Sequence, residues 1–137
     1  MMAVGVVIVT HYRLGEEFLQ ALRLIVPDAP RFHAVSIDPK QSIEGMRRAI
    51  AAALEQADAG SGVLILTDMF GGTPSNISLS FLKDHPVEVV TGVNLPMLIK
   101  LATLTEPKGL EELATFIKNY GQRNISVASE ILPEGSR

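Results

Sequence analysis

The sequence contains no cysteine and no tryptophan, and only 2 tyrosines and 5 phenylalanines among its 137 residues. Without cysteine the chain cannot form disulfide bonds, thiolate metal sites or a cysteine nucleophile, and nothing in it indicates an oxidising compartment. An excess of one charge is also lacking, because 12 basic and 15 acidic residues leave a net charge of −3. No basic patch is visible, so we expect no nucleic-acid partner.

Long apolar runs are absent as well, since no stretch reaches the ~18 residues that a membrane-spanning helix needs. The apolar start of the chain lacks a basic leader and a small-residue cleavage site, and two acidic residues follow soon after. This pattern is not typical of a signal peptide, so we expect a cytoplasmic protein that is not embedded in a membrane. The length is typical of a single domain, which we expect to span residues 1–137 with a loose tail at 129–137.

Strand and helix patterns alternate along the chain. Apolar runs predict strands at Val4–Thr10, Phe32–Ile37, Val63–Thr67 and Val87–Thr91, and a last short strand at Ile125–Ala128. Amphipathic spacing predicts helices at Leu14–Val26, Ser42–Gln56, Pro74–Lys83, Leu95–Leu104 and Gly109–Tyr120. Repeated strand-helix-strand units place helices on both faces of a parallel sheet. We therefore predict an open three-layer α/β/α domain whose four-stranded sheet is mainly parallel.

The helical spacing also predicts which side chains face the sheet. In the first helix these are Leu14, Phe18, Leu22 and Ile25, and in the second they are Ile43, Met46, Ile50 and Leu54. Ser42 stands directly before the second helix and is predicted to cap its N-terminus through the hydroxyl oxygen.

Polar residues follow three of the predicted strands at the point where each strand ends. His11 follows the first strand, Asp68 follows the third, and the segment 91–94 ends the fourth. The carboxyl ends of parallel strands share one edge of the sheet, where open α/β folds bind their ligands. We therefore expect these groups to lie close together.

A glycine-rich turn, Gly71-Gly72-Thr73-Pro74, leads from the third strand into the next helix. Proline suits the first position of a helix, because its missing N–H would have no partner there, and Thr73 is then the predicted N-cap. The two glycines allow backbone N–H groups to approach a ligand closely. A helix start of this kind attracts anions, phosphate above all.

These parts fit together as a histidine that accepts and passes on a phosphoryl group. A carboxylate that accepts a hydrogen bond from one ring nitrogen fixes the tautomer and leaves the lone pair of the other nitrogen free. Such a transfer needs no metal and no cofactor on the protein. Taken singly, His11 could be an ordinary loop residue and Asp68 a turn residue. His33 and His85 have no carboxylate at a matching strand end, and we expect structural roles for both.

Three segments resemble the enzyme IIA component of mannose-type (mannose, fructose and sorbose) sugar phosphotransferase systems. They are Val9–His11, Thr67–Asn76 and Gly92–Leu98, and the resemblance extends over about Val4–Ala128. It implies that His11 is the phosphorylated histidine, that Asp68 pairs with its ring, and that Thr73 contacts the phosphoryl group. It also implies HPr as donor, a IIB protein as acceptor, and a homodimer in which the last strand, here Ile125–Ala128, crosses to the partner's sheet.

The chain departs from the resemblance directly after the histidine, where the family usually carries a small residue and this sequence has Tyr12-Arg13. The bulkier side chains could line the rim of the pocket or contact a partner. A possible docking surface also includes Phe70, Asn94, Leu95 and Met97, although the three apolar side chains among them could equally pack against neighbouring helices.

Other functions stay open on the sequence alone. One is a regulatory phosphoprotein of the same relay without sugar transport, and another is the phosphotransfer subunit of a dihydroxyacetone kinase. A third is a module that binds a nucleotide or anion without covalent modification of His11.

Overall fold

The computed structural model describes residues 3–133, which form a parallel four-stranded sheet of order β2-β1-β3-β4. The strands are β1 (Gly5–His11), β2 (His33–Ile37), β3 (Val63–Thr67) and β4 (Val87–Thr91). All three pairings between neighbouring strands are parallel. The predicted open α/β fold is therefore confirmed.

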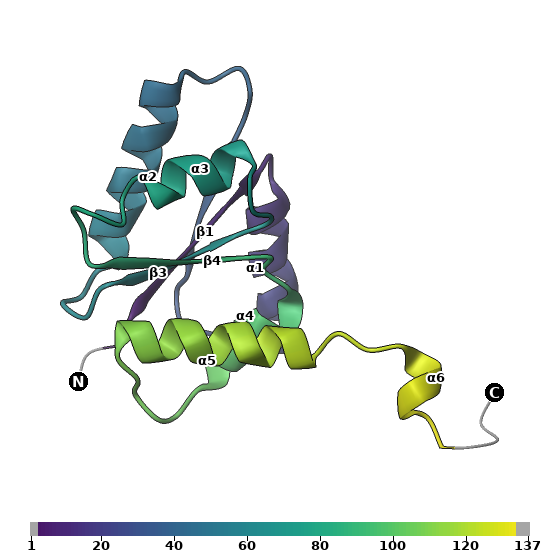
Figure 1. Ribbon diagram of the computed structural model, residues 1–137. Coiled ribbons are helices and arrows are strands. Elements are labelled where there is room, and N and C mark those ends of the chain that lie inside the picture. Colours follow the sequence, from purple (N-terminus) through teal and green to yellow (C-terminus); the bar gives the residue numbers. More distant parts are fainter. Residues whose placement is uncertain (1–2, 134–137) are drawn as a thin grey trace.

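Helices cover both faces of this sheet (Figure 1). The helices α1 (Leu14–Ile25), α4 (Leu95–Thr103) and α5 (Leu110–Arg123) contribute side chains to the core on one face. The helices α2 (Ile43–Ala57) and α3 (Thr73–Leu79) pack on the other face. None of the helices in residues 3–133 has the combination of length and apolar character required to span a bilayer.

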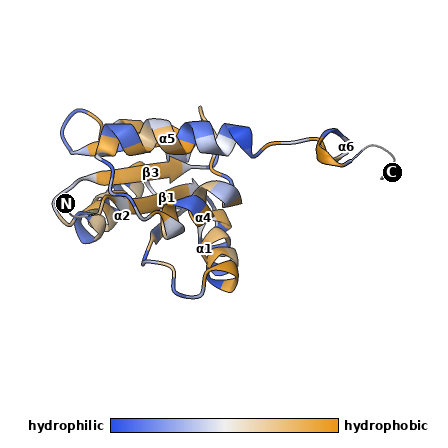
Figure 2. Ribbon diagram, turned by 90° about the horizontal axis from the view of Figure 1, so that it is seen from below, coloured by the Kyte–Doolittle hydropathy of each residue, from blue (hydrophilic) through white to orange (hydrophobic). Residues whose placement is uncertain are grey.

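The two faces have separate cores because successive side chains of a strand point to opposite sides of the sheet. In β1, Val6 and Ile8 belong to the core under α1, whereas Val7 and Val9 belong to the core under α2. All four are buried. This explains why the two central strands, β1 and β3, read as continuous apolar runs, and Figure 2 shows both in the hydrophobic colour while α5 carries both colours.

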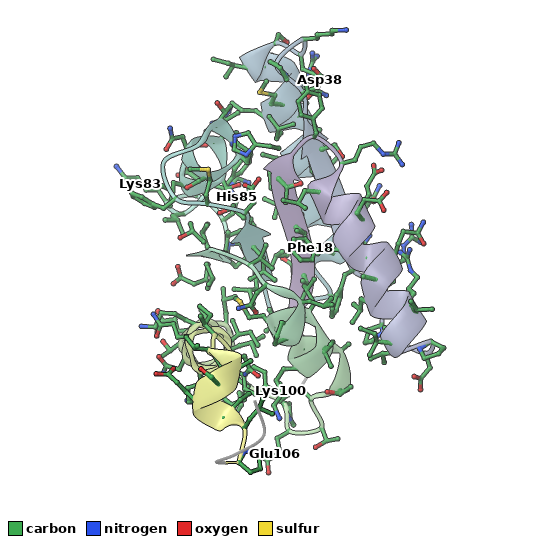
Figure 3. All side chains as sticks on the ribbon, turned by 90° about the vertical axis from the view of Figure 1, so that its right-hand side faces the viewer. Phe18, Asp38, Lys83, His85, Lys100 and Glu106 are labelled. Carbon is green, nitrogen blue, oxygen red and sulfur yellow. The ribbon has the colours of Figure 1, made fainter. Side chains whose placement is uncertain are left out.

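The helix faces agree with prediction in their centres and differ at their ends. Phe18 points from α1 toward the sheet (Figure 3), and Ile50 is fully buried. However, Ile43 is 68% exposed, Ile25 is 52% exposed and Leu14 is 45% exposed. These three residues are the first or last of their helices. A helix of 15 residues such as α2 spans about 22 Å, and a strand of 5 residues such as β2 spans about 16 Å, so helix ends extend beyond the strands.

The predicted cap of α2 is present, and it begins the helix where the sequence indicated. The hydroxyl oxygen of Ser42 accepts a hydrogen bond from the N–H of Gly45 at 3.0 Å. This satisfies one of the N–H groups that have no partner within the helix.

The segment after α5 was predicted to form a strand that crosses to a partner's sheet, which a single chain does not test. Residues 125–127 pair with no strand within residues 3–133, and Ala128–Ile131 form a short helix, α6. We call residues 124–132 the C-terminal arm. It extends away from the sheet (Figure 1), so no neighbouring strand is available to form a ladder with it. Pairing with the sheet of a second subunit stays a prediction, and residues 134–137 of the predicted tail lie outside the described residues.

Candidate functional site

The site lies where the chain changes direction across the sheet. From β1 the chain moves outward to β2 and then returns to the other side of β1 as β3. The crevice at the carboxyl ends of two strands related in this way is where open α/β folds bind ligands. Val9 of β1 pairs with Thr67 of β3, so His11 at the end of β1 and Asp68 just after β3 reach the same edge.

The structure brings the imidazole of His11 and the carboxylate of Asp68 into direct contact. The ring Nδ1 of His11 lies 2.8 Å from Oδ2 of Asp68. The backbone N–H of His11 donates to the same oxygen at 3.0 Å. The other carboxylate oxygen, Oδ1, accepts a hydrogen bond from the backbone N–H of Met69 at 3.1 Å. The carboxylate is therefore fixed by three hydrogen bonds, two of them from His11.

These contacts determine which nitrogen of the ring is free. Burial alone raises the pKa of Asp68, but the hydrogen bonds from the ring and backbone of His11 outweigh burial and hold that pKa below its ordinary value. An ionised carboxylate can only accept hydrogen bonds, so Nδ1 carries the proton and Nε2 has an available lone pair when the ring is neutral. The His11 side chain is 46% exposed and that of Asp68 is 12% exposed. The arrangement offers a nucleophilic nitrogen to an incoming group.

The glycine turn lies against the free side of this ring. A Cβ atom on Gly72 would stand 2.7 Å from Cε1 and 3.2 Å from Nε2 of His11, so only glycine permits this approach without moving the ring. Gly71 has a φ of +88°, which glycine adopts readily. A Cβ at Gly71 would meet no atom within 4 Å, so glycine is favoured there by the backbone conformation and not by crowding. The turn thus brings main-chain groups beside Nε2.

The start of α3 differs by one residue from the prediction. Gly72, with extended backbone, is the N-cap, and Thr73 is the first residue of the helix and makes no capping hydrogen bond. The N–H of Asn76 donates to the carbonyl of Gly72, which sets this boundary. Pro74 accordingly takes the second helical position. Thr73 is exposed, so its hydroxyl is not occupied by capping and lies at the turn that approaches His11.

The helix is also shorter than the predicted Pro74–Lys83. The Ser78 hydroxyl donates to the carbonyl of Pro74, and the Ser80 hydroxyl donates to that of Ile77. Such side-chain bonds compete with the main-chain ladder, and α3 ends at Leu79.

Thr10 positions the site and was not identified from the sequence. It is fully buried, and its Oγ1 accepts a hydrogen bond from the N–H of Gly15 at 2.7 Å. A Cβ on Gly15 would lie 3.2 Å from the same oxygen, so the start of α1 fits closely against the end of β1. The available signal was a hydroxyl side chain inside an apolar run, one residue before His11.

The predicted docking residues divide into exposed and structural ones. Tyr12 is 59% exposed and Phe70 is 71% exposed, both in loops that begin at the site. Arg13 is exposed and forms an ion pair with Glu16 at 3.3 Å. Leu95 is half-buried at the start of α4.

Asn94 and Met97 hold α4 against α5, which is the packing alternative that the sequence left open for Met97, and contact of either residue with a partner stays a prediction. The side chain of Asn94 accepts a hydrogen bond from the N–H of Met97 and donates one to the carbonyl of Gly121, each at 3.1 Å. Met97 is only 2% exposed, and its sulfur would lie 2.6 Å from a Cβ on Gly121. The apolar spacing could not separate this packing from docking.

The other two histidines lie outside the site. His33 begins β2, and its pKa is lowered by burial and by the nearby Arg31. His85 packs edge-on against the ring of Phe81 and lies across the sheet from α1 (Figure 3). Within residues 3–133, no group of three or more histidine or acidic side chains is placed to hold a metal ion.

Comparison with known proteins gives a consistent result. The family described as "PTS system fructose IIA component" matches residues 5–118. A sorbose-specific EIIA component of Lacticaseibacillus casei is 31% identical, with 91% of each chain covered. A fructose-specific EIIA component of Bacillus subtilis is 29% identical over 94% of this chain and 89% of its own. Among solved structures, a mannose/sorbose specific IIA subunit from Enterococcus faecalis has a TM-score of 0.85 and 30% identity, covering 97% of this chain and 98% of its own.

The contact between Gly72 and the ring predicts the effect of a single added carbon. In Gly72→Ala, the imidazole is displaced because it is the movable partner, and its hydrogen bond to Asp68 is lost while the fold persists. Correlation spectra of the ring nitrogens of His11 should show a loss of the Nδ1–H tautomer. Gly109→Ala is the matched control, since a Cβ there meets no atom within 4 Å. An unchanged His11 spectrum in Gly72→Ala would contradict the geometry.

The lowered pKa of Asp68 predicts how stability depends on pH. A carboxyl group whose pKa is lowered in the folded state stabilises the fold at pH values above its ordinary pKa. This stabilisation is lost as the pH falls through the folded-state pKa. Asp68→Asn should therefore lower the Tm at pH 7, and the deficit should shrink toward pH 3. Thermal unfolding by circular dichroism tests this, with the exposed Asp28→Asn as control. A deficit that is the same at every pH would count against the pairing.

Proposed function

The chain belongs to the mannose-type IIA family of the sugar phosphotransferase system, and from this premise we propose that it carries a phosphoryl group on His11. The observation that carries the proposal is the 2.8 Å contact between Nδ1 of His11 and Asp68, with Gly72 beside the opposite nitrogen. A histidine oriented in this way can form a phosphoramidate bond with little further chemistry, because phosphoryl transfer depends mainly on positioning and charge stabilisation.

In the proposed transfer, Nε2 of His11 attacks the phosphorus of a phosphohistidine on HPr. The new N–P bond forms as the donor's N–P bond breaks, and the donor imidazole departs with the electron pair of that bond. Asp68 accepts the Nδ1–H hydrogen bond throughout and stabilises the positive charge that develops on the ring. The backbone of Gly71 and Gly72 and the exposed hydroxyl of Thr73 are proposed to contact the phosphoryl oxygens.

We further propose that phosphorylated His11 passes its group to a IIB protein, as part of sugar uptake. The sorbose- and fructose-specific names of the relatives support a carbohydrate relay of this class. The carbohydrate itself is not assigned, because a IIA unit does not bind it.

A single substitution tests the acceptor. With phosphoenolpyruvate, enzyme I and HPr, labelled phosphate should be incorporated into the parent protein and not into His11→Ala. Asp68→Asn should be labelled roughly 10–100-fold more slowly, because its ring is less well held. His85→Ala is the control and should be labelled normally, since that exposed histidine lies apart from Asp68. Labelling of His11→Ala at the parent rate would refute the proposal. Release of the label on addition of a IIB protein tests the second step.

The C-terminal arm supports the proposal of a homodimer. Its apolar side chains do not pack against the rest of the chain, and Ile125, Val127 and Ile131 are 75%, 59% and 69% exposed. Apolar side chains exposed together are unfavourable in water and are typical of a surface that a partner covers. We propose that the arm binds a second copy, with residues 125–128 pairing at the sheet of that copy.

The oligomeric state in solution tests the role of the arm. Light scattering during size-exclusion chromatography should give the parent protein twice its chain mass of 14.8 kDa. The double variant Ile125→Asp, Val127→Asp should give a single chain mass, because two charges would be buried in the interface. Ile43→Asp introduces a charge at another exposed apolar position and should leave the dimer intact. A parent protein that is monomeric at all concentrations would exclude the dimer.

A further inference from the structure

Tyr12, the residue directly after the proposed phosphoryl acceptor, has an unfavourable backbone conformation. Its φ is +47°, and within residues 3–133 it is the only non-glycine residue with a positive φ. In the left-handed region the Cβ of an L-residue crowds its own backbone, which glycine avoids. A tyrosine at this position therefore lowers stability relative to a glycine, unless its ring forms compensating contacts within the fold.

The hydrogen bonds that hold Tyr12 are made by its backbone. The N–H of Tyr12 donates to the carbonyl of Ile37 at 2.9 Å and so extends the pairing of β1 with β2 by one residue. The turn is held further by the 2.7 Å hydrogen bond from Gly15 to Thr10. Any residue type except proline could donate this backbone hydrogen bond. The tyrosine side chain is 59% exposed, so burial within this chain does not account for it.

Three other exposed apolar side chains follow closely in the chain after His11 or Asp68. Leu14 is the first residue of α1 and is 45% exposed, while Met69 and Phe70 in the loop after β3 are 54% and 71% exposed. The Met69 side chain lies 3.6 Å from the Cβ position of Gly72, beside the imidazole. We call Tyr12, Leu14, Met69 and Phe70 the apolar rim. Both loops that hold the His11–Asp68 pair therefore present apolar surface to solvent.

We propose that Tyr12 is a specificity-determining residue that contacts the phosphoprotein partner during transfer. This inference rests on the proposed function of His11. The partner that fits this rim is a protein with apolar surface around its phosphorylated side chain. Such a surface covers the rim and excludes water from the transferred group. A small phosphate donor reaches Nε2 without covering the rim, so it does not depend on Tyr12. The backbone conformation with this unfavourable φ is the one in which Tyr12 presents its ring to such a partner.

Two donors distinguish contact with a partner from an effect on His11 itself. Phosphorylated HPr is the protein donor. Phosphoramidate is the small donor, which forms the same Nε2–P bond while its own P–N bond breaks and ammonia leaves. Tyr12→Ala and Tyr12→Gly should both be phosphorylated about fivefold to tenfold more slowly by HPr, a loss typical of an aromatic contact residue. Phosphoramidate should phosphorylate both variants at the parent rate. Tyr12→Phe should keep the parent rates.

The stability of the same variants tests the backbone part of the inference. Tyr12→Gly should raise the Tm by about 2–4 °C, because glycine relieves the positive φ, whereas Tyr12→Ala keeps the unfavourable conformation and should show no rise. Leu24→Ala removes an apolar side chain that is 83% exposed near the end of α1 and should change neither rate.

The possible outcomes separate the two proposals. Unchanged rates with HPr in Tyr12→Ala and Tyr12→Gly, or equal losses with both donors, would overturn the assignment of Tyr12. A fall in the Tm of Tyr12→Gly would overturn the argument from its conformation. If neither donor phosphorylates the parent protein at His11, the proposed function fails, whatever the variants of Tyr12 do.

Discussion

The parallel pairing of β1 with β3 is the constraint on which the rest of the site depends. Its register places Val9 opposite Thr67, and this alignment brings His11 and Asp68 together although they are 57 positions apart in the chain. A shift by one residue would turn each side chain to the other face of the sheet. Because β1 and β3 are central strands buried on both faces, the two cores hold this register firmly.

Those parts of the fold that depend on burial could be predicted from the sequence. The central strands β1 and β3 read as apolar runs because they are covered on both faces, and His11 and Asp68 stand out because each directly follows such a run. Strand order was not needed to expect that the two residues share an edge, since parallel strands bring all their carboxyl ends to one side. The Nδ1 contact itself, and the close approach of Gly72, required coordinates.

The differences arise where neighbours in space decide the outcome. Helical periodicity includes Ile43 and Ile25 in the apolar face, but it contains no information on where the strands beneath them end. Met97 has the same apolar character whether it binds a partner or packs against α5. Thr73 is a good capping residue, yet the first main-chain bond of α3 begins at Gly72. Within residues 3–133 the arm has no neighbouring strand, so a strand there would need the sheet of a second copy, which stays a prediction.

A single oxygen of Asp68 accepts hydrogen bonds from both the ring and the main-chain N–H of His11, and this has a consequence for dynamics. Swinging the imidazole out would break its hydrogen bond to Asp68, so the entropy of orienting the ring is largely lost once, when the chain folds. In the proposed phosphoryl transfer, most of the movement that brings phosphorus and nitrogen together would then come from the approaching donor. Disturbances that loosen these two loops should impair turnover well before they unfold the domain.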